Sequence, residues 1–161
     1  MRLASMPVAV IMQRRAVRHP WADEAWAAVG VVPDCGGLPQ VQELDPSEHS
    51  GQDGSAQGGE DECRHYLVPG LQLELYPDEN DGYFENCIAP EPKVFVMWRM
   101  RDGIAMPVQA SVSYAEGTRM LDSGESADGV AMPAAIHAWL VCYLQAHYQP
   151  PPQGRRGRQH G

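Results

Sequence analysis

Alternating apolar and polar positions mark the beginning of the chain. Residues 7–18 place Val8 and Val10 on one face of an extended segment, and residues 26–32 read WAAVGVV. A period of two is typical of a strand with one buried face, so we predict a strand over each range. The link HPWADEA, residues 19–25, is too long for a two-residue turn, and we expect one irregular helical turn there.

The same alternation returns in the middle of the chain. Leu71, Leu73 and Leu75 occupy every second position, which predicts a half-buried strand. The segment PDENDG that follows predicts a turn, and YFENCIA, residues 83–89, predicts a short strand. Residues 93–100 are apolar at both parities, which is typical of a central strand covered on both faces.

Turn and helix signals complete the predicted architecture. Asp102-Gly103 is a strong two-residue hairpin signal. Residues 114–122 predict a short helix that ends near Gly124. Residues 133–148 predict a longer helix with one apolar stripe, formed by Ile136, Trp139, Leu140, Tyr143, Leu144 and His147.

These elements predict an α+β fold that is mainly β. Short strands joined by turns favour an antiparallel meander of six or seven strands, which forms a bent sheet or a partly open barrel. One long C-terminal helix and one shorter helix pack against it. We expect a single globular domain over residues 7–148, because 161 residues are enough to bury a core.

Composition separates two segments from that domain. Residues 39–61 are rich in Gly, Ser, Gln and acids and contain almost nothing to bury, so we expect a disordered insertion. Residues 149–161 contain three prolines and no apolar pattern, so we expect a disordered tail.

The charge of the chain limits its partners. The formal net charge is −9 and the pI is about 5.0. Phosphate-rich and anionic surfaces attract basic proteins, so we expect neither nucleic-acid nor membrane binding. The first residues resemble a signal peptide only faintly, since the apolar run contains Pro7 and ends at Gln13. We therefore expect a cytoplasmic protein.

Candidate chemistry is sparse. Cys63 and His65 would share a strand face and are weak candidates for metal ligands, but no second closely spaced pair completes a four-ligand set. Cys87 and Cys142 lie in apolar contexts, and we expect them to be buried thiols. Neither a nucleophile elbow nor a phosphate-binding glycine motif occurs. We expect no cofactor and no catalytic residue, and we lean against an enzyme.

The segment RRAVRHPWADEAW is the strongest candidate for a binding surface. It contains Arg14, Arg15, His19, Trp21 and Trp26. Trp and Arg are the favoured anchors of protein interfaces. Arg14 and Arg15 are neighbours on a strand, so their side chains point to opposite faces. The alternative is that the tryptophans fill a corner of the core and the arginines are simply solvated.

Several motifs together resemble a known family. R-R-x-x-x-H-P-W with a second Trp, E-L-Y followed by Tyr83 and Asn86, and L-D-S-G-E before a helix led by Met-Pro occur in this order over most of residues 7–148. This combination is similar to an uncharacterised proteobacterial family, the domain of unknown function three-three-zero-five. The acidic insertion departs from the family pattern. The family has no established activity and contributes no catalytic residues.

The resemblance also implies a functional context. Genes of that family tend to lie near those of molybdenum-dependent formate dehydrogenase and its maturation factors. The leading hypothesis is therefore a non-enzymatic accessory domain that binds a protein partner, formate dehydrogenase or one of its maturation factors. One alternative is an enzyme or small-ligand binder that acts on the molybdenum cofactor or a precursor. Another is a structural homo-oligomer.

Overall fold

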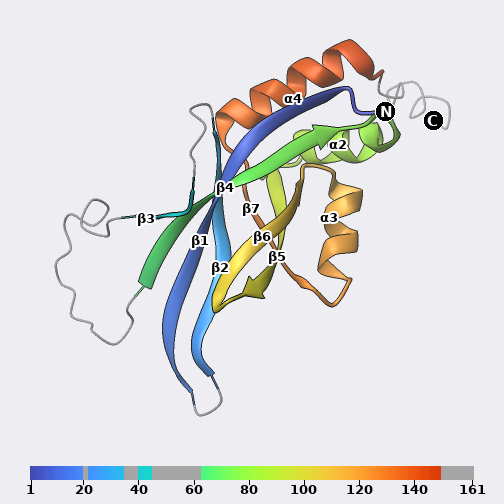
Figure 1. Ribbon diagram of the computed structural model, residues 1–161. Helices are drawn as coiled ribbons and strands as arrows, with labels where there is room; N and C mark the ends of the chain where they lie inside the picture. Colours follow the sequence, from blue (N-terminus) through green and yellow to red (C-terminus); the bar gives the residue numbers. More distant parts are fainter. Residues whose placement is uncertain (20–21, 35–39, 45–62, 150–161) are drawn as a thin grey trace.

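The computed structural model describes residues 1–19, 22–34, 40–44 and 63–149. Within these ranges seven strands form two antiparallel sheets (Figure 1). The first, here called the long sheet, contains in spatial order β2 (Ala22–Pro33), β1 (Ala4–His19), β4 (Cys63–Leu75) and β3 (Gln42–Leu44). The second, the short sheet, contains β6 (Ile104–Ser111), β5 (Lys93–Arg101) and β7 (Ser126–Ala131).

The predicted α+β class and the antiparallel pairing are confirmed. The described strands, however, do not follow one another in a single meander, and they form no closed barrel. β2 lies beside β7 and β4 lies beside β6, yet neither pair belongs to one sheet. Pro69 interrupts β4 where its register with β1 shifts, and Pro107 lies where the register of β6 with β5 shifts. Because proline has no N–H to donate, both strands are poor partners for a continuous ladder.

The hairpin of β1 and β2 is longer than its sequence pattern predicts. The two strands pair from Val8 opposite Pro33 to His19 opposite Ala22. The expected helical turn is therefore wrong for residues 22–25, because β2 begins at Ala22. Strand pairing satisfies the backbone groups of these residues, which would otherwise need a turn of their own.

The expected insertion over residues 39–61 contains one short strand. Gln42, Glu43 and Leu44 form β3 and pair with Leu67, Tyr66 and His65 of β4. The prediction of disorder is wrong for these three residues, because a sheet edge supplies hydrogen-bond partners that the sequence does not show. The rest of the predicted insertion beyond residue 44, up to residue 61, and the tail beyond residue 149 lie outside the described residues.

A helix replaces the strand predicted over residues 83–89. The chain forms a 3₁₀ turn, η1 (Pro77–Glu79), and then α2 (Asn80–Cys87). Its buried positions include Asn80, Tyr83 and Asn86, which recur at helical spacing. Two of the three are polar, so an apolar pattern could not reveal the helix. The Asn86 amide donates to the carbonyls of Lys93 and Val112, at 2.8 Å each.

The two predicted helices are confirmed. α3 (Tyr114–Leu121) is capped at its start by Ser113, whose hydroxyl accepts the Glu116 N–H. Gly124 follows the helix with a φ of +87°. α4 (Ala134–His147) follows Pro133. Its buried positions are Ile136, Leu140, Tyr143 and Leu144, whereas Trp139 is half-buried and His147 is exposed at the margins of the predicted stripe.

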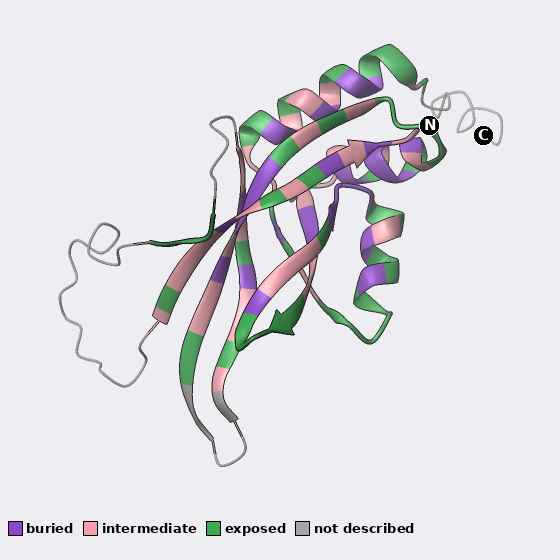
Figure 2. Cartoon of the chain, in the orientation of Figure 1, coloured by how far each residue is buried: buried purple, intermediate pink, exposed green. Residues whose placement is uncertain are grey.

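The core lies between the two sheets, and the long sheet extends beyond the short one (Figure 2). The carboxylate of Asp128 joins the sheets near that limit. Asp128 Oδ2 on β7 accepts hydrogen bonds from Trp98 Nε1 at 2.8 Å and from the Ala28 N–H at 3.0 Å. The register of β2 with β1 shifts so that Val29 has no partner residue on β1, and at this shift Ala28 donates to Asp128 instead of to a strand.

We predict that Asp128→Ala lowers the free energy of unfolding by about 1–3 kcal/mol, because it removes the acceptor of two hydrogen bonds between the sheets. The Trp98 indole also loses its partner, so the fluorescence of the native state should change. Urea unfolding measures both effects. Asp122→Ala, at an exposed carboxylate after α3, is the control. Equal stabilities of the two variants would contradict the prediction.

Candidate functional site

Arg14 and Trp26 lie directly opposite one another on β1 and β2. Met12 and Ala28 form the next pair on the same face, and both are buried in the core. Arg14 and Trp26 therefore lie on the core side of the long sheet, farther along the hairpin than the contact with Asp128. Figure 1 shows that the hairpin of β1 and β2 extends past the end of the short sheet. Trp26 is only partly buried and packs against the margin of the core.

Trp26 packs against a second aromatic ring. Its ring centroid lies 5.8 Å from that of Tyr66 on β4, with an interplanar angle of 32°. Trp26 Nε1 donates to Glu24 Oε2 at 3.3 Å, and Arg14 Nε donates to Glu24 Oε1 at 2.5 Å. This hydrogen bond to Glu24 is the main cause that raises the pKa of Arg14. The side chains of Arg14 and Glu24 remain 41% and 31% exposed, so both can still contact another molecule.

A second ion pair extends this surface to the edge of the sheet. Arg64 of β4 lies directly opposite Arg14 and contacts Glu43 of β3, with Nη1 and Oε2 3.4 Å apart. Both side chains are about half exposed, and such ion pairs contribute little to stability. We call the surface the distal face; it consists of Arg14, Glu24, Trp26, Glu43, Arg64 and Tyr66.

Of the other predicted interface residues, Arg15 alone has a described side chain, and it does not join the distal face. Arg15 is exposed and lies on the opposite face of β1, as the strand parity predicts. His19 ends β1, and its side chain lies outside the described residues, as does Trp21. The sequence did not indicate Tyr66, because its place beside Trp26 depends on the pairing of β1 with β4. The sequence could have indicated Glu24, because residues two apart on one strand point to the same face, and Glu24 lies two residues before Trp26.

The weak metal candidates form no cluster. Cys63 and His65 do share a face of β4, and His65 Nε2 lies 3.3 Å from the side-chain nitrogen of Gln13. Among the described residues, no group of three or more His, Cys, Asp or Glu side chains is arranged to hold a metal ion. Two potential ligands on one strand are too few for a stable site.

The expectation of two buried thiols is wrong. Cys142 is exposed on α4 because it lies opposite the buried stripe, and Cys87 is half-buried at the end of α2. His137 Nε2 lies 3.5 Å from Cys87 Sγ but only 3.0 Å from the Cys87 carbonyl oxygen. A ring N–H that donates to this carbonyl cannot accept the thiol proton. Burial also raises the pKa of Cys87, so this pair lacks the properties of a nucleophile and its base.

A polar groove lies at the other junction between the sheets. It encloses about 440 Å³ between β4, β6 and the start of α3. We call it the α3 groove; its lining residues are Leu71, Gln72, Glu74, Tyr76, Val108, Gln109, Ala110 and Glu116. The sequence analysis did not indicate it, because its carboxylates come from segments that are far apart in the chain.

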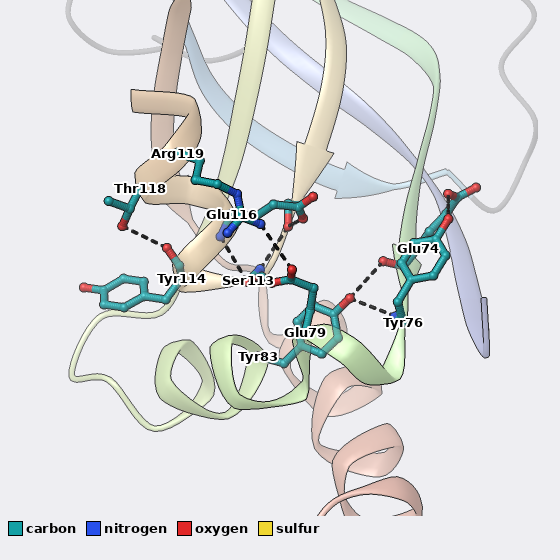
Figure 3. Close-up of polar contacts among 10 residues, drawn as sticks. Glu74, Tyr76, Glu79, Tyr83, Ser113, Tyr114, Glu116, Thr118 and Arg119 are labelled. Carbon is teal, nitrogen blue, oxygen red and sulfur yellow. Dashed lines mark hydrogen bonds and ion pairs between the residues drawn. The ribbon is translucent and has the colours of Figure 1, made fainter. Parts of the chain in front are cut away.

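Hydrogen bonds hold the wall of the groove in place (Figure 3). The Tyr76 hydroxyl donates to Glu74 Oε1 at 2.6 Å, and the Tyr83 hydroxyl accepts the Tyr76 N–H at 2.9 Å. The bond to Glu74 is the main cause that raises the pKa of Tyr76 and lowers the pKa of Glu74. Burial raises the pKa of Tyr83. The three side chains therefore stay in their present protonation states at neutral pH.

The wall of the α3 groove that contains Glu116 is held in place by contacts of α3 and the residues just before it. The Ser111 hydroxyl donates to Glu116 Oε1 at 2.5 Å. Ser113, which is fully buried, donates through its hydroxyl to Glu79 Oε1 at 2.7 Å. Arg119 Nη2 lies 3.1 Å from Glu79 Oε2. These contacts connect η1 with the first turns of α3 and leave Glu116 directed at the groove (Figure 3).

We predict that Cys87 reacts more slowly with iodoacetamide than Cys142 at pH 7.5. The raised pKa of Cys87 reduces its thiolate fraction, and the thiolate is the reacting species. Mass spectrometry of peptides from the folded protein measures each rate, and unfolded protein is the control in which the two rates converge. Faster alkylation of Cys87 in the folded chain would show an activated thiol and contradict this reading.

None of the described helices is long and apolar enough to span a bilayer.

Comparison with known proteins places the chain in a family. No curated protein and no solved structure matches the chain. A family model described as "Protein of unknown function (DUF3305)" matches residues 7–157. This range contains both sheets apart from the first residues of β1, together with the distal face and the α3 groove. The chain therefore belongs to the DUF3305 family.

Proposed function

We propose that this chain is a non-enzymatic accessory domain that binds a protein partner through the distal face. One observation carries the proposal. The Trp26–Tyr66 pair, which is partly buried and packs against the margin of the core, lies beside the partly exposed Arg14–Glu24 ion pair on the core side of the long sheet. An apolar centre with charged groups around it is the usual composition of an interface between proteins.

The chemistry of the distal face suits a protein better than a small molecule. Aromatic and arginine side chains contribute most of the binding energy in many interfaces. Both acids of this face already pair with arginines, so the surface presents alternating charges that a complementary partner can match. No cavity is needed for such contacts, because the side chains of four neighbouring strands supply one continuous surface.

The proposal also names a partner. The family resemblance implies a gene neighbourhood with molybdenum-dependent formate dehydrogenase and its maturation factors, so we propose a cytoplasmic role in the assembly or regulation of that enzyme. The α3 groove does not favour the alternative of a molybdenum-cofactor binder. Two carboxylates line it, and they would repel the phosphate group of such a ligand.

Affinity capture from the native host tests the proposal. The chain should recover formate dehydrogenase or its maturation factors. Trp26→Ala should abolish this recovery, and Arg14→Ala should reduce it at least about tenfold, as expected for a residue at the centre of an interface. Arg15→Ala is the matched control, because it removes the same charge from the opposite face of the same strand and should leave recovery unchanged.

Two outcomes would contradict the proposal. Equal loss of recovery in the Arg14 and Arg15 variants would show that overall charge, and not the distal face, determines capture. Normal formate dehydrogenase activity in a deletion strain, together with recovery of unrelated proteins alone, would exclude the proposed partner. Circular dichroism of each variant shows whether the fold is retained.

A further inference from the structure

The α3 groove is formed by outward-facing polar side chains from three elements. Gln72, Glu74 and Tyr76 alternate with the buried Leu73 and Leu75, so they face outward from the long sheet. Gln109 of β6 and Glu116 of α3 complete the polar lining. The groove is thus a concave, largely polar surface built outside the hydrophobic core.

A second hollow continues the groove along α3. It encloses about 230 Å³, and Gln109 and Glu116 line both hollows. Its other lining residues include Arg119 and Ser123 from the later part of α3 and the turn after it. Because the two hollows share Gln109 and Glu116, the concave surface extends from the α3 groove along α3.

The carboxylates in the groove are oriented before any ligand binds. Ser111 holds Glu116 through Oε1, and Oε2 accepts no hydrogen bond from a described side chain. Tyr76 holds Glu74 through Oε1. Fixed acceptors lose little conformational entropy on binding, so their interaction with a ligand is stronger than that of free surface side chains.

One guanidinium of the chain already occupies the rim. Arg2 Nη1 lies 3.0 Å from Glu74 Oε2. The Arg2 side chain is 53% exposed, and the first residues of the chain form no part of the core. An exposed ion pair of this kind is weak, so a better-placed cation can displace Arg2. The contact also shows that the geometry of Glu74 suits a guanidinium.

We propose that the α3 groove binds an organic cation, an ammonium or guanidinium group held between the carboxylates of Glu74 and Glu116. The side-chain amide oxygens of Gln72 and Gln109 accept its remaining N–H groups, and neither amide bonds to another described residue. The cation belongs either to a free small molecule or to a lysine or arginine side chain of another protein. This site shares no residue with the distal face and does not depend on the proposed partner.

Titration of the full chain with two probes tests the proposal. Agmatine represents a free cation, and the peptide N-acetyl-Gly-Arg-Gly-amide represents a protein side chain. Nuclear magnetic resonance follows the side-chain amides of Gln72 and Gln109. Saturation by agmatine identifies a small-molecule site, and saturation by the peptide alone identifies a protein side chain. No saturation by either probe up to about 10 mM, where the standard free energy is only a few kcal/mol, overturns the proposal.

Three variants show whether the groove is responsible. Glu116→Gln keeps the acceptor for Ser111 but removes the charge, and it should weaken binding at least about fivefold. Arg2→Ala frees Glu74 and should tighten binding up to about fivefold. Glu125→Gln is the control, because Glu125 pairs with Arg99 outside the groove and its loss changes the net charge equally. Equal effects of Glu116→Gln and Glu125→Gln would overturn the proposal, since they would show attraction to net charge alone.

Discussion

The two hydrogen bonds of Asp128 are the interaction on which the rest of the molecule depends. The long and short sheets share no backbone ladder, so side chains must define how the sheets meet. Asp128 of β7 holds the Ala28 N–H of β2 and the Trp98 indole of β5 with one oxygen. A carboxylate with two donors adds a fixed direction to this junction, which apolar contact alone does not specify.

This junction also lies near the limit of the core. On the core side of the long sheet, Met12 and Ala28 are buried, and the next pair, Arg14 and Trp26, is partly exposed. The same two strands therefore contribute to the core and to the distal face. At the second junction between the sheets, β4 and β6 leave a hollow between them, which is the α3 groove. Both candidate sites thus result from the separation of the strands into two sheets.

Local signals predicted the elements whose stability is local. Asp102 and Gly103 have φ values of +53° and +80°, the conformation that a two-residue hairpin turn requires, and such a turn is recognisable from two residues. The stripe of α4 was recognisable because its buried residues are apolar. α2 was not, because Asn80 and Asn86 are buried through partners elsewhere. Asn80 accepts the Tyr143 hydroxyl at 2.8 Å, and Asn86 donates to the carbonyls of Lys93 and Val112.

The sequence by itself determined the face to which each strand residue points, since alternation follows from backbone geometry alone. It placed Arg14 and Arg15 on opposite sides of β1. It also identified Trp26 as a candidate interface residue, with packing in the core as the alternative. Only the tertiary structure decided that Arg14, Trp26 and Tyr66 meet, and that Glu74 and Glu116 line one groove. These groups come from segments that are distant in the chain. Their proximity depends on which strands pair and where the short sheet ends, and no local pattern encodes either.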